Sequence, residues 1–576
     1  MNRSGQTAPL DGDRQGKHGT NEDDSQPYRA DGGTALQDSY DVIVGGSGMS
    51  ASTTATILGN HGLDVAMIEA GSHPRFAIGE AMLPQSSMWM WIVGQYHGIP
   101  EIQYLSDANA IVDNITSSCG IKHSIGFAYH EPGQPVSADR SHQLIPPNLP
   151  FYSESHLLRA DVDHYLVETA QKYGVDYVDE TAITDVDIGD NEVTVTTDRG
   201  EIDAAFYVDG TGGNSVLADQ MGYREDAPEL ETNSRAVFTH VEGLAPFDEV
   251  IAADARPGQS NRLHDGTLHH VFDGGWMWII PFDNFERSAA TKASVGLMLD
   301  RDKHPVDDSI SPAEEARRII AEFPDIERHL ATAEPVKPWT RTGRIQRSAS
   351  QSAGHRHYLT NSTYGFVDPL YAIGLVNTFE SVFVSTNLLL EAFEDGDFSA
   401  DRFAPIDDLH HQQLIDNDRL ISNAYKSMGE FRLWNAWTQM WLGGVLFHDL
   451  YIQRHCFNYF ESGETAEFDS LLDETSPGAD APFAAEKADI HQTMADALDD
   501  YEVGEATAAE AAELMLAEMK GADWLPKHVY DWGNEGARHV DFANPQLVGK
   551  LIEWGKTESP DHIREDLFDF TVPEMA

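Results

Sequence analysis

The chain has 576 residues, of which 41% are hydrophobic, and its 95 acidic and 38 basic side chains give a formal net charge of −57. This length is enough for two or three lobes around a sizeable core. The acidic excess argues against nucleic acid and against an anionic membrane surface as partners, because both carry the same sign of charge. Since the acidic residues are spread along the whole chain, we interpret them as an adaptation to high salt.

The cysteines and histidines form no metal or disulfide pattern. Cys119 and Cys456 are the only cysteines, and neither belongs to a C-x-x-C motif. The histidine pairs at 269–270 and 410–411 lack the context of zinc ligands. No apolar run reaches the length of a membrane span, and the N-terminus has no signal-peptide core. We therefore expect a cytoplasmic protein with no metal site and no membrane span.

The first segment with a regular pattern predicts a β-α-β unit. Residues 1–38 are polar and rich in Gly, Asp and Gln, which is typical of a disordered tail. An apolar run at 41–45 predicts a buried strand, 49–60 predicts a helix closed by Gly62, and 65–69 predicts a second strand. The three elements together form one unit of a parallel sheet.

The turn between the first strand and the helix carries a G-x-G-x-x-A pattern. Gly46 permits the tight turn, Gly48 lets the backbone approach a pyrophosphate, and Ala51 lets helix and strand pack closely. The free N–H groups of the helix start would face the phosphates. Glu69 ends the second strand, where an acid bonds a ribose hydroxyl. This context predicts a dinucleotide site.

Two later segments favour FAD over NAD as the nucleotide. Arg159 and Asp163 open a stretch with helical spacing, and a strand ends in Asp209, followed by a turn that contains Gly210 and Gly212. Both segments resemble the secondary FAD motifs of the flavoprotein monooxygenase superfamily. The alternative is a surface ion pair for Arg159 and a plain turn for the glycines.

Three segments carry a more specific pattern. Residues 74–84 read PRFAIGEAMLP, residues 276–281 fit W-x-W-x-I-P, and residues 364–374 read YGFVDPLYAIG. On a strand, Trp276 and Trp278 would share one face and exclude water from the space beside them. All three segments resemble the flavin-dependent halogenases.

The resemblance to the flavin-dependent halogenases implies a role for each segment. The loop with Glu80 would cross the flavin, and the two tryptophans with Pro281 would separate the flavin from the organic substrate. The segment 364–374 would close on the flavin ring and offer backbone N–H groups to a halide. The residues implied there are Asp368 and Pro369 at the flavin, and Ile373 and Gly374 at the halide.

The resemblance also implies a catalytic lysine. Members of the family have a lysine between flavin and substrate, and the stretch that carries it aligns with 118–127, which makes Lys122 the candidate. Strand alternation places Lys122 opposite Ile121 and His123. A lysine in such a strand would be partly desolvated, which lowers its pKa and makes it reactive. The alternative is a surface lysine whose amine reaches solvent.

Some positions depart from the family pattern. Indole-acting members carry a glutamate where this chain has Tyr371, and phenol- and pyrrole-acting members lack that acid, so the substrate leans phenolic. Ser362 stands where many of these flavoproteins have an aspartate. Ala372 and Ile373 replace small hydroxylic residues, which would reshape the halide pocket. A chain with this loop is also compatible with a flavoprotein that does not halogenate.

The predicted fold is α/β, with a glutathione-reductase-like FAD-binding Rossmann domain, a β-sheet substrate lobe and a helical C-terminal cap. We expect the FAD-binding domain at 39–225 and 335–400, the β-rich lobe at 226–334 and the helical region at 401–576. Trp434, Trp437 and Trp441 share one helical face, which favours core packing, with a lid over an aromatic substrate as the alternative.

The resemblance implies an FAD-dependent oxidoreductase that halogenates an electron-rich aromatic compound (a phenol, pyrrole or indole) through a flavin hydroperoxide and hypohalous acid. Because no second dinucleotide fingerprint is evident, reduced FAD would come from a separate NAD(P)H-dependent flavin reductase. The alternatives on the same scaffold are an FAD-dependent monooxygenase, an isoprenoid-lipid (geranylgeranyl) reductase and a non-catalytic flavin-binding protein.

The charge of −57 predicts a folded state that needs salt. Self-repulsion among the acidic side chains destabilises the folded state, and molar salt screens it because the Debye length falls to about 3 Å. We expect the melting temperature to rise steadily from dilute buffer to molar KCl. A melting temperature that is flat over this range would contradict the halophilic interpretation.

Overall fold

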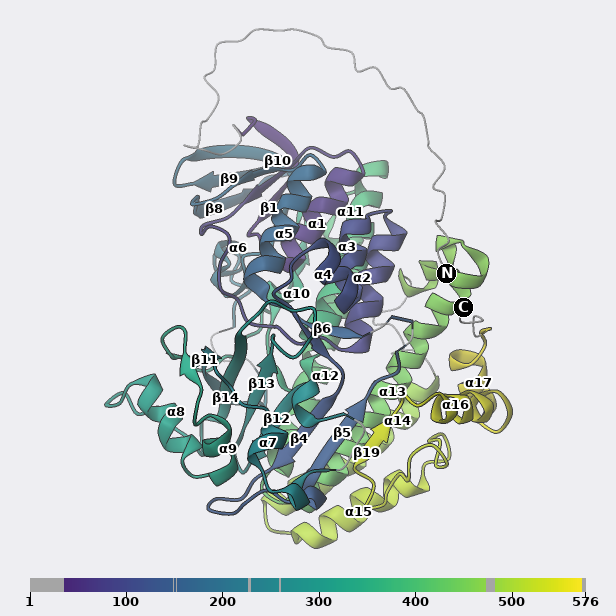
Figure 1. Ribbon diagram of the computed structural model, residues 1–576. Coiled ribbons are helices and arrows are strands. Elements are labelled where there is room, and N and C mark those ends of the chain that lie inside the picture. Colours follow the sequence, from purple (N-terminus) through teal and green to yellow (C-terminus); the bar gives the residue numbers. More distant parts are fainter. Residues whose placement is uncertain are drawn as a thin grey trace, which may run out of the picture.

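The chain folds into a sheet with a parallel core, a second and mainly antiparallel sheet, and a set of C-terminal helices (Figure 1). The computed structural model describes residues 36–148, 150–151, 153–225, 229–257, 261–472 and 482–571. The tail predicted at 1–38 lies outside the described residues, except for its last three positions.

The parallel core is built from the apolar runs that the sequence shows. β1 (Ser39–Gly45) pairs in parallel with β2 (Val65–Ile68) on one side and with β10 (Gly200–Asp209) on the other. Val42 and Val44 have no exposed surface, and burial of such a side chain contributes about 1.5–3 kcal/mol. The other strands of this sheet are β7 (Asp176–Val178), β8 (Ile183–Ile188), β9 (Val193–Thr197), β17 (Ala353–Gly354) and β18 (His357–Leu359).

Helix α1 (Met49–Asn60) begins directly after β1, at the residues predicted from the pattern. It packs against α5 (Arg159–Lys172) and against α11 (Gly374–Asp395). Its N-terminus therefore lies at the carboxyl ends of β1 and β10, where ligands bind in parallel sheets.

The second sheet carries the two tryptophans on a central strand. β13 (Gly275–Pro281) pairs antiparallel with β12 (Thr267–Phe272) and with β14 (Lys292–Asp300). The other strands of this sheet are β4 (Ile125–Tyr129), β5 (Ser141–Ile145), β11 (Ser234–Glu242), β15 (Glu334–Pro335), β16 (Thr340–Arg341) and β19 (His539–Asp541).

A separate two-stranded sheet holds the candidate lysine. β3 (Gly120–Lys122) pairs antiparallel with β6 (Glu154–His156), and Lys122 stands opposite Glu154 in the register. Since directly opposed residues on antiparallel strands have their Cβ atoms about 4.5–5.5 Å apart, this register brings an acid beside the lysine.

Helices dominate the chain after position 374. The long helix α13 (Phe431–Ser462) packs against α2 (Pro84–Tyr96) and against α12 (Ala400–Ser427). The other helices of eight or more residues are α8 (Pro312–Ile320), α14 (Pro482–Glu502), α15 (Ala508–Gly521) and α16 (Pro545–Thr557), and the shorter ones are α3 (Pro100–Gln103), α4 (Ala108–Asn114), α6 (Val216–Gln220), α7 (Phe247–Val250), α9 (Pro324–His329), α10 (Asn361–Tyr364) and α17 (Asp561–Leu567).

One described helical segment, Leu370–Asp395, is long and apolar enough to cross a membrane by length and composition. Within its most apolar window, 67% of the residues are buried inside the protein. This burial is that of a core helix, which packs on α1, α2 and α12.

The predicted fold class is confirmed, although the sheets take their strands from wider ranges than one interval each. β4 and β5 come from residues before 150, and β19 comes from the C-terminal region, yet all three belong to the sheet of the two tryptophans. The C-terminal region is thereby joined to this sheet through β5. The division into the ranges 39–225, 226–334, 335–400 and 401–576 stays a prediction.

Candidate functional site

The turn after β1 shows why glycine stands at its first position. Gly46 has φ +83°, and a Cβ added there would lie 2.5 Å from the carbonyl oxygen of Gly210. A Cβ on Gly210 would in turn lie 2.7 Å from the Cβ of Ala51. The turn, the strand end and the helix therefore approach so closely that only very small residues fit.

Gly48 and the start of α1 form an open cradle. Gly48 is the N-cap of α1 and has no side-chain cap, and a Cβ added to it would meet no atom within 4 Å. The buried Oγ of Ser50 has no hydrogen-bond partner among the described residues. Free N–H groups and an unpartnered hydroxyl at a helix start are what a pyrophosphate needs, so this part of the chain fits a dinucleotide.

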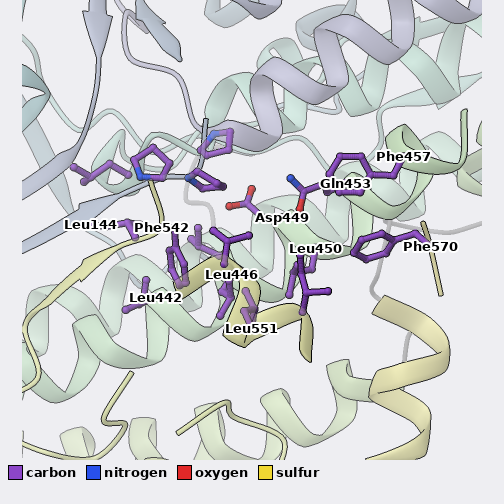
Figure 2. A pocket seen from close by; sticks show the side chains of 17 residues that line it. Leu144, Leu442, Leu446, Asp449, Leu450, Gln453, Phe457, Phe542, Leu551 and Phe570 are labelled. Carbon is purple, nitrogen blue, oxygen red and sulfur yellow. The ribbon is translucent and has the colours of Figure 1, made fainter. Parts of the chain in front are cut away.

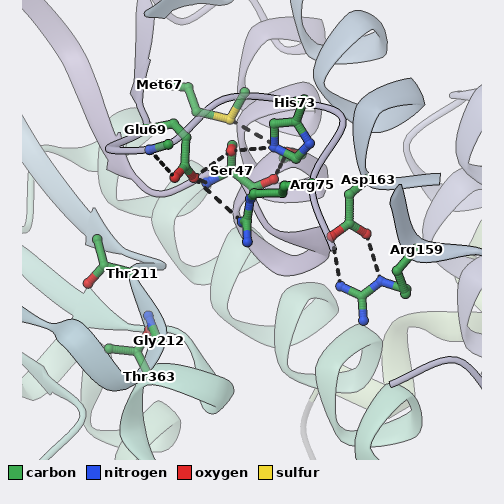
Figure 3. Close-up of polar contacts among 12 residues, drawn as sticks. Ser47, Met67, Glu69, His73, Arg75, Arg159, Asp163, Thr211, Gly212 and Thr363 are labelled. Atoms are coloured by element: carbon green, nitrogen blue, oxygen red, sulfur yellow. Dashed lines mark hydrogen bonds and ion pairs between the residues drawn. The ribbon is translucent and has the colours of Figure 1, made fainter. Parts of the chain in front are cut away.

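Glu69 holds the turn together (Figure 3). Its Oε2 accepts hydrogen bonds from the backbone N–H of Ser47 at 3.0 Å and from the Ser47 hydroxyl at 2.6 Å, and its Oε1 accepts one from the N–H of Gly71. Burial acts to raise the pKa of the Glu69 carboxyl, but these hydrogen bonds and the charge of Arg75 lower it below its ordinary value. Both oxygens are thus engaged by the protein.

A large cavity, called the first cavity below, opens beside the start of α1. Its empty volume is about 1640 Å³, including its solvent-facing part. It lies between the parallel sheet and the sheet of the two tryptophans. The predicted site residues that line it are Gly48, Ala51, Glu80, Arg159, Gly210, Trp276, Trp278, Asp368, Pro369 and Gly374.

The remaining predicted residues lie behind this lining. The buried carboxylate of Asp209 accepts hydrogen bonds from the hydroxyls of Thr211 and Ser215, so it shapes the turn after β10. Gly212 has φ +69° and donates its N–H to the hydroxyl of Thr363. Gly46, Glu69, Pro281, Ile373 and Lys122 are likewise absent from the cavity wall.

Arg159 fixes the loop over the first cavity. Its guanidinium forms a bidentate pair with Asp163, with N–O distances of 2.7 and 3.0 Å (Figure 3). It also donates hydrogen bonds to the carbonyl oxygens of Ile78 and Gly79. The next residue, Glu80, forms a buried 2.8 Å hydrogen bond with His240 of β11. The loop is therefore attached to α5 on one side and to β11 of the second sheet on the other.

The two tryptophans form one wall of the first cavity. The ring centroids of Trp276 and Trp278 lie 5.9 Å apart, and both side chains are buried. Trp278 donates its indole N–H to the hydroxyl of Ser294. His269 also lines this wall, packs on Trp276, and is neutral because burial lowers its pKa to about 3. Its Nδ1 is hydrogen-bonded to the carbonyl oxygen of Gly126.

The loop before α11 is strained. Tyr371 and Ala372 both have positive φ angles, +69° and +58°, although neither is glycine. Each such residue costs about 1–2 kcal/mol, and strain of this kind collects at functional sites. The loop turns the start of α11 toward the first cavity, which Ala372 and Gly374 line. Asp368 anchors the loop by accepting hydrogen bonds from the hydroxyls of Ser234 and Tyr425.

Tyr371 points away from the first cavity. Its ring is buried and stacks on Trp441, with 4.7 Å between centroids, and lies 6.3 Å from Trp434. Trp434, Trp437 and Trp441 are all buried, so the expectation of core packing is confirmed. The residue that departs from the family pattern thus belongs to the interface with α13.

Lys122 is buried and is hydrogen-bonded to a segment, residues 81–84, that lies between two cavities. Its side chain is 1% exposed, and Nζ donates a 2.5 Å hydrogen bond to the carbonyl oxygen of Met82. Burial lowers the pKa of the Lys122 amine to about 8, although the charge of Glu154 acts to raise it. Burial also raises the pKa of Glu154 to about 7, against the charge of Lys122. A buried amine with a lowered pKa has a larger unprotonated fraction near neutral pH than a surface lysine.

The residues on either side of Met82 face different spaces. Ala81 lines the first cavity, whereas Pro84 lines a second cavity with an empty volume of about 750 Å³, including its solvent-facing part (Figure 2). The second cavity is mainly apolar and is bounded by one face of α13, with Ile125 on the facing strand β4. Its polar side chains are Asp449 and Gln453, one turn apart on α13.

Glu154, Asp449 and this second cavity were not found from the sequence. Glu154 lies 32 residues from Lys122, and nothing local indicates that the two strands pair. A signal for the cavity did exist, since Asp449 and Gln453 interrupt the otherwise apolar face of a long helix.

Known proteins resemble this chain in sequence and in overall fold. No family model matches the chain. Over 545 residues it is 34% identical to the monodechloroaminopyrrolnitrin halogenase PrnC of Pseudomonas fluorescens, which covers 92% of this chain and 94% of that one. It is 31% identical to the tetracycline 7-halogenase of Kitasatospora aureofaciens, over 91% and 94% of the two chains. The structure of the halogenase PltM in complex with phloroglucinol and FAD superimposes with a TM-score of 0.79 and 29% identity, over 84% of this chain and 96% of that one.

The open space at Gly48 predicts that Gly48→Val prevents FAD binding. The added side chain would fill the place of the pyrophosphate without straining the fold, because a Cβ there meets no protein atom within 4 Å. We expect FAD affinity, measured by flavin fluorescence, to fall more than about 100-fold. Gly549→Val is the matched control, since Gly549 is exposed on α16 and also faces open space. Unchanged FAD affinity in Gly48→Val would disprove the placement of the nucleotide.

Proposed function

The chain belongs to the flavin-dependent halogenases and uses FAD as its cofactor, and on this premise we propose that it attaches chlorine or bromine to an electron-rich aromatic ring. The observation that carries the proposal is the position of Lys122, buried between the first cavity, which fits FAD, and a second, apolar cavity. A monooxygenase would need its substrate directly at the flavin and would have no use for a buried amine beyond it.

The first cavity supplies the residues that would hold FAD. The N–H groups at the start of α1, with Gly46 and Gly48, would bind the pyrophosphate. Glu69 would act through the turn, because its oxygens are engaged by Ser47 and Gly71. Arg159 and Glu80 would hold the loop that crosses the ring system. Reduced FAD, when bound, activates dioxygen and so makes an oxidised form of the halide.

The strained loop at 371–374 would hold the halide. The backbone at Ile373 and Gly374 lies at the N-terminus of α11, where partial positive charge attracts an anion. Gly374 and Ala372 line the first cavity, so an anion there would stand beside the flavin. Trp276 and Trp278, with Pro281 at the end of their strand, would keep the organic ring out of this space.

Lys122 would then handle the oxidised halogen. Its amine can donate a hydrogen bond to hypohalous acid, or accept the halogen and release a water molecule. Burial favours either role, because the amine is held in place at Met82 and its unprotonated form is accessible. The aromatic substrate would lie in the second cavity, on the far side of Met82.

The names of the relatives indicate the class of substrate. PrnC, the tetracycline 7-halogenase and the pyrrole-2-carbonyl chlorinase carry names of aromatic substrates, and PltM was solved with phloroglucinol. A phenol or a pyrrole as substrate agrees with Tyr371, which stands where indole-acting members carry a glutamate.

We also propose that a separate NAD(P)H-dependent flavin reductase supplies reduced FAD. Both enzymes would work in the cytoplasm, where NAD(P)H is available.

Replacement of Lys122 separates flavin chemistry from halogen transfer. We expect Lys122→Ala and the near-isosteric Lys122→Met to bind FAD and consume oxygen at close to the wild-type rate, yet to lose at least about 100-fold in halogenated product. Lys122→Arg should fail as well, because a guanidinium offers no free amine. The measurements are oxygen uptake and product mass with reduced FAD, bromide and a phenol.

Lys303→Ala is the control, because Lys303 is a half-exposed lysine paired with Asp273 on the surface. It should keep full activity. Bromide-dependent product from Lys122→Ala at the wild-type rate would contradict the role of Lys122. Hydroxylated product without any need for halide would contradict the proposed function itself.

A further inference from the structure

The second cavity contains a carboxyl group that the protein itself leaves unbound. It is walled mainly by Leu, Ile, Val, Phe and Pro side chains, with α13 on one side and strands of the second sheet on the other (Figure 2). Asp449 stands in the middle of this wall, between Leu446 and Gln453. An acid in an apolar wall is costly to bury without a partner, so its presence calls for an explanation.

Neither oxygen of Asp449 accepts a hydrogen bond within the described part of the chain, and Oδ1 is fully buried. The residue as a whole keeps some accessible surface because its side chain lines the cavity. Structural buried acids in this protein look different. Asp368 and Asp209, for example, are each bound by two or more hydroxyl and N–H groups.

The surroundings favour the neutral form of Asp449. Burial raises the pKa of its carboxyl well above the ordinary range, and the nearby charge of Glu154 adds to this rise. Among the described residues that line the cavity, none is a lysine or an arginine. A protonated carboxyl group can both donate and accept a hydrogen bond, and it matches a neutral partner rather than an ion.

Asp449 also lies near Glu154 and therefore near Lys122, where halogen transfer would take place. Glu154, whose charge acts on Asp449, is the cross-strand partner of Lys122. Helix α13 is tied to the start of α2, which follows Met82, by a hydrogen bond from the Gln85 side chain to the carbonyl oxygen of Val445, one turn before Asp449. A ring held at Asp449 would therefore have one edge toward Lys122.

We propose that Asp449 is the anchor of the aromatic substrate: it hydrogen-bonds a hydroxyl or N–H group on an uncharged ring and thereby decides which ring carbon faces Lys122. This assignment rests on the proposed function, which it narrows to phenols, aryl amines or N–H heterocycles without a charged side chain. The assignment excludes a free amino acid, because its carboxylate would find no cation among the described residues that wall the second cavity.

The test uses one ring with and without hydrogen-bond donors. Phloroglucinol and its trimethyl ether share a ring, but only phloroglucinol can donate a hydrogen bond. Their dissociation constants are measured by calorimetry with the FAD-loaded protein, in the wild type, in Asp449→Leu and in Asp449→Asn. We expect Asp449→Leu to weaken phloroglucinol binding by about tenfold and to leave the ether unchanged. Asp449→Asn keeps a donor and an acceptor, so it should retain most of the affinity.

The same set of variants also controls for misfolding and for the position of the anchor. Replacing an unpartnered buried acid by leucine should not lower the melting temperature, and FAD binding should not change, because Asp449 does not line the first cavity. Gln453→Leu, one turn along the same wall, should keep the preference for phloroglucinol. Loss of the preference in Gln453→Leu but not in Asp449→Leu would place the anchor at Gln453 and overturn the assignment.

Turnover with bromide separates this assignment from the proposed function. Wild type that binds phloroglucinol through Asp449 but forms no brominated product would refute halogenation and leave the anchor intact. Wild type that brominates the ring while Asp449→Leu does so with the same KM and the same product isomers would refute the anchor alone. Equal binding of the two rings, or no binding of phloroglucinol, would also refute the anchor.

Discussion

A lysine amine that is 1% exposed must find its hydrogen-bond and charge partners within the protein, because water does not reach it. The loop that supplies one of these partners also separates the two cavities. Nζ of Lys122 has the carbonyl of Met82 as a hydrogen-bond acceptor and the carboxyl of Glu154 as a neighbour across the strand pair. Breaking a buried pair by removing one partner is costly, whereas the intact pair is roughly neutral for stability. The burial of Lys122 is therefore better explained by what it does to the amine, whose pKa it lowers to about 8 against the charge of Glu154, than by what it adds to the fold.

The carbonyl that holds Lys122 belongs to the loop that separates the two cavities. One end of this loop is fixed by Arg159 and by the hydrogen bond between Glu80 and His240, and the other runs into α2, which packs against α13. The C-terminal helices thus supply a wall of the second cavity, and β19 joins their region to the sheet of the two tryptophans. A protein cut before α13 would keep the nucleotide turn but lose the second cavity.

The local parts of this arrangement could be predicted from the sequence. The turn at Gly46 and Gly48, the helix that follows and the strand with Trp276 and Trp278 depend on residues within a few positions of one another, and their patterns are specific. The position of Lys122 came from a resemblance, and the structure adds its burial. Glu154, His240 and Asp449 could not be predicted, because each acts on a residue far away in the chain, such as Glu80, which is 160 residues from His240. Tyr371 belongs to the segment that was expected to close on the flavin ring, and the sequence did not show that its own ring packs on the tryptophans of α13.

The separation of flavin and substrate by Lys122 and Met82 is tested most directly by a crystal structure with FAD and a brominated phenol, recorded at the bromine absorption edge. We predict that the anomalous signal of bromine lies in the second cavity, with Lys122 between it and the flavin. A bromine signal inside the first cavity, against Trp276 and the flavin ring, with the second cavity empty, would contradict this account.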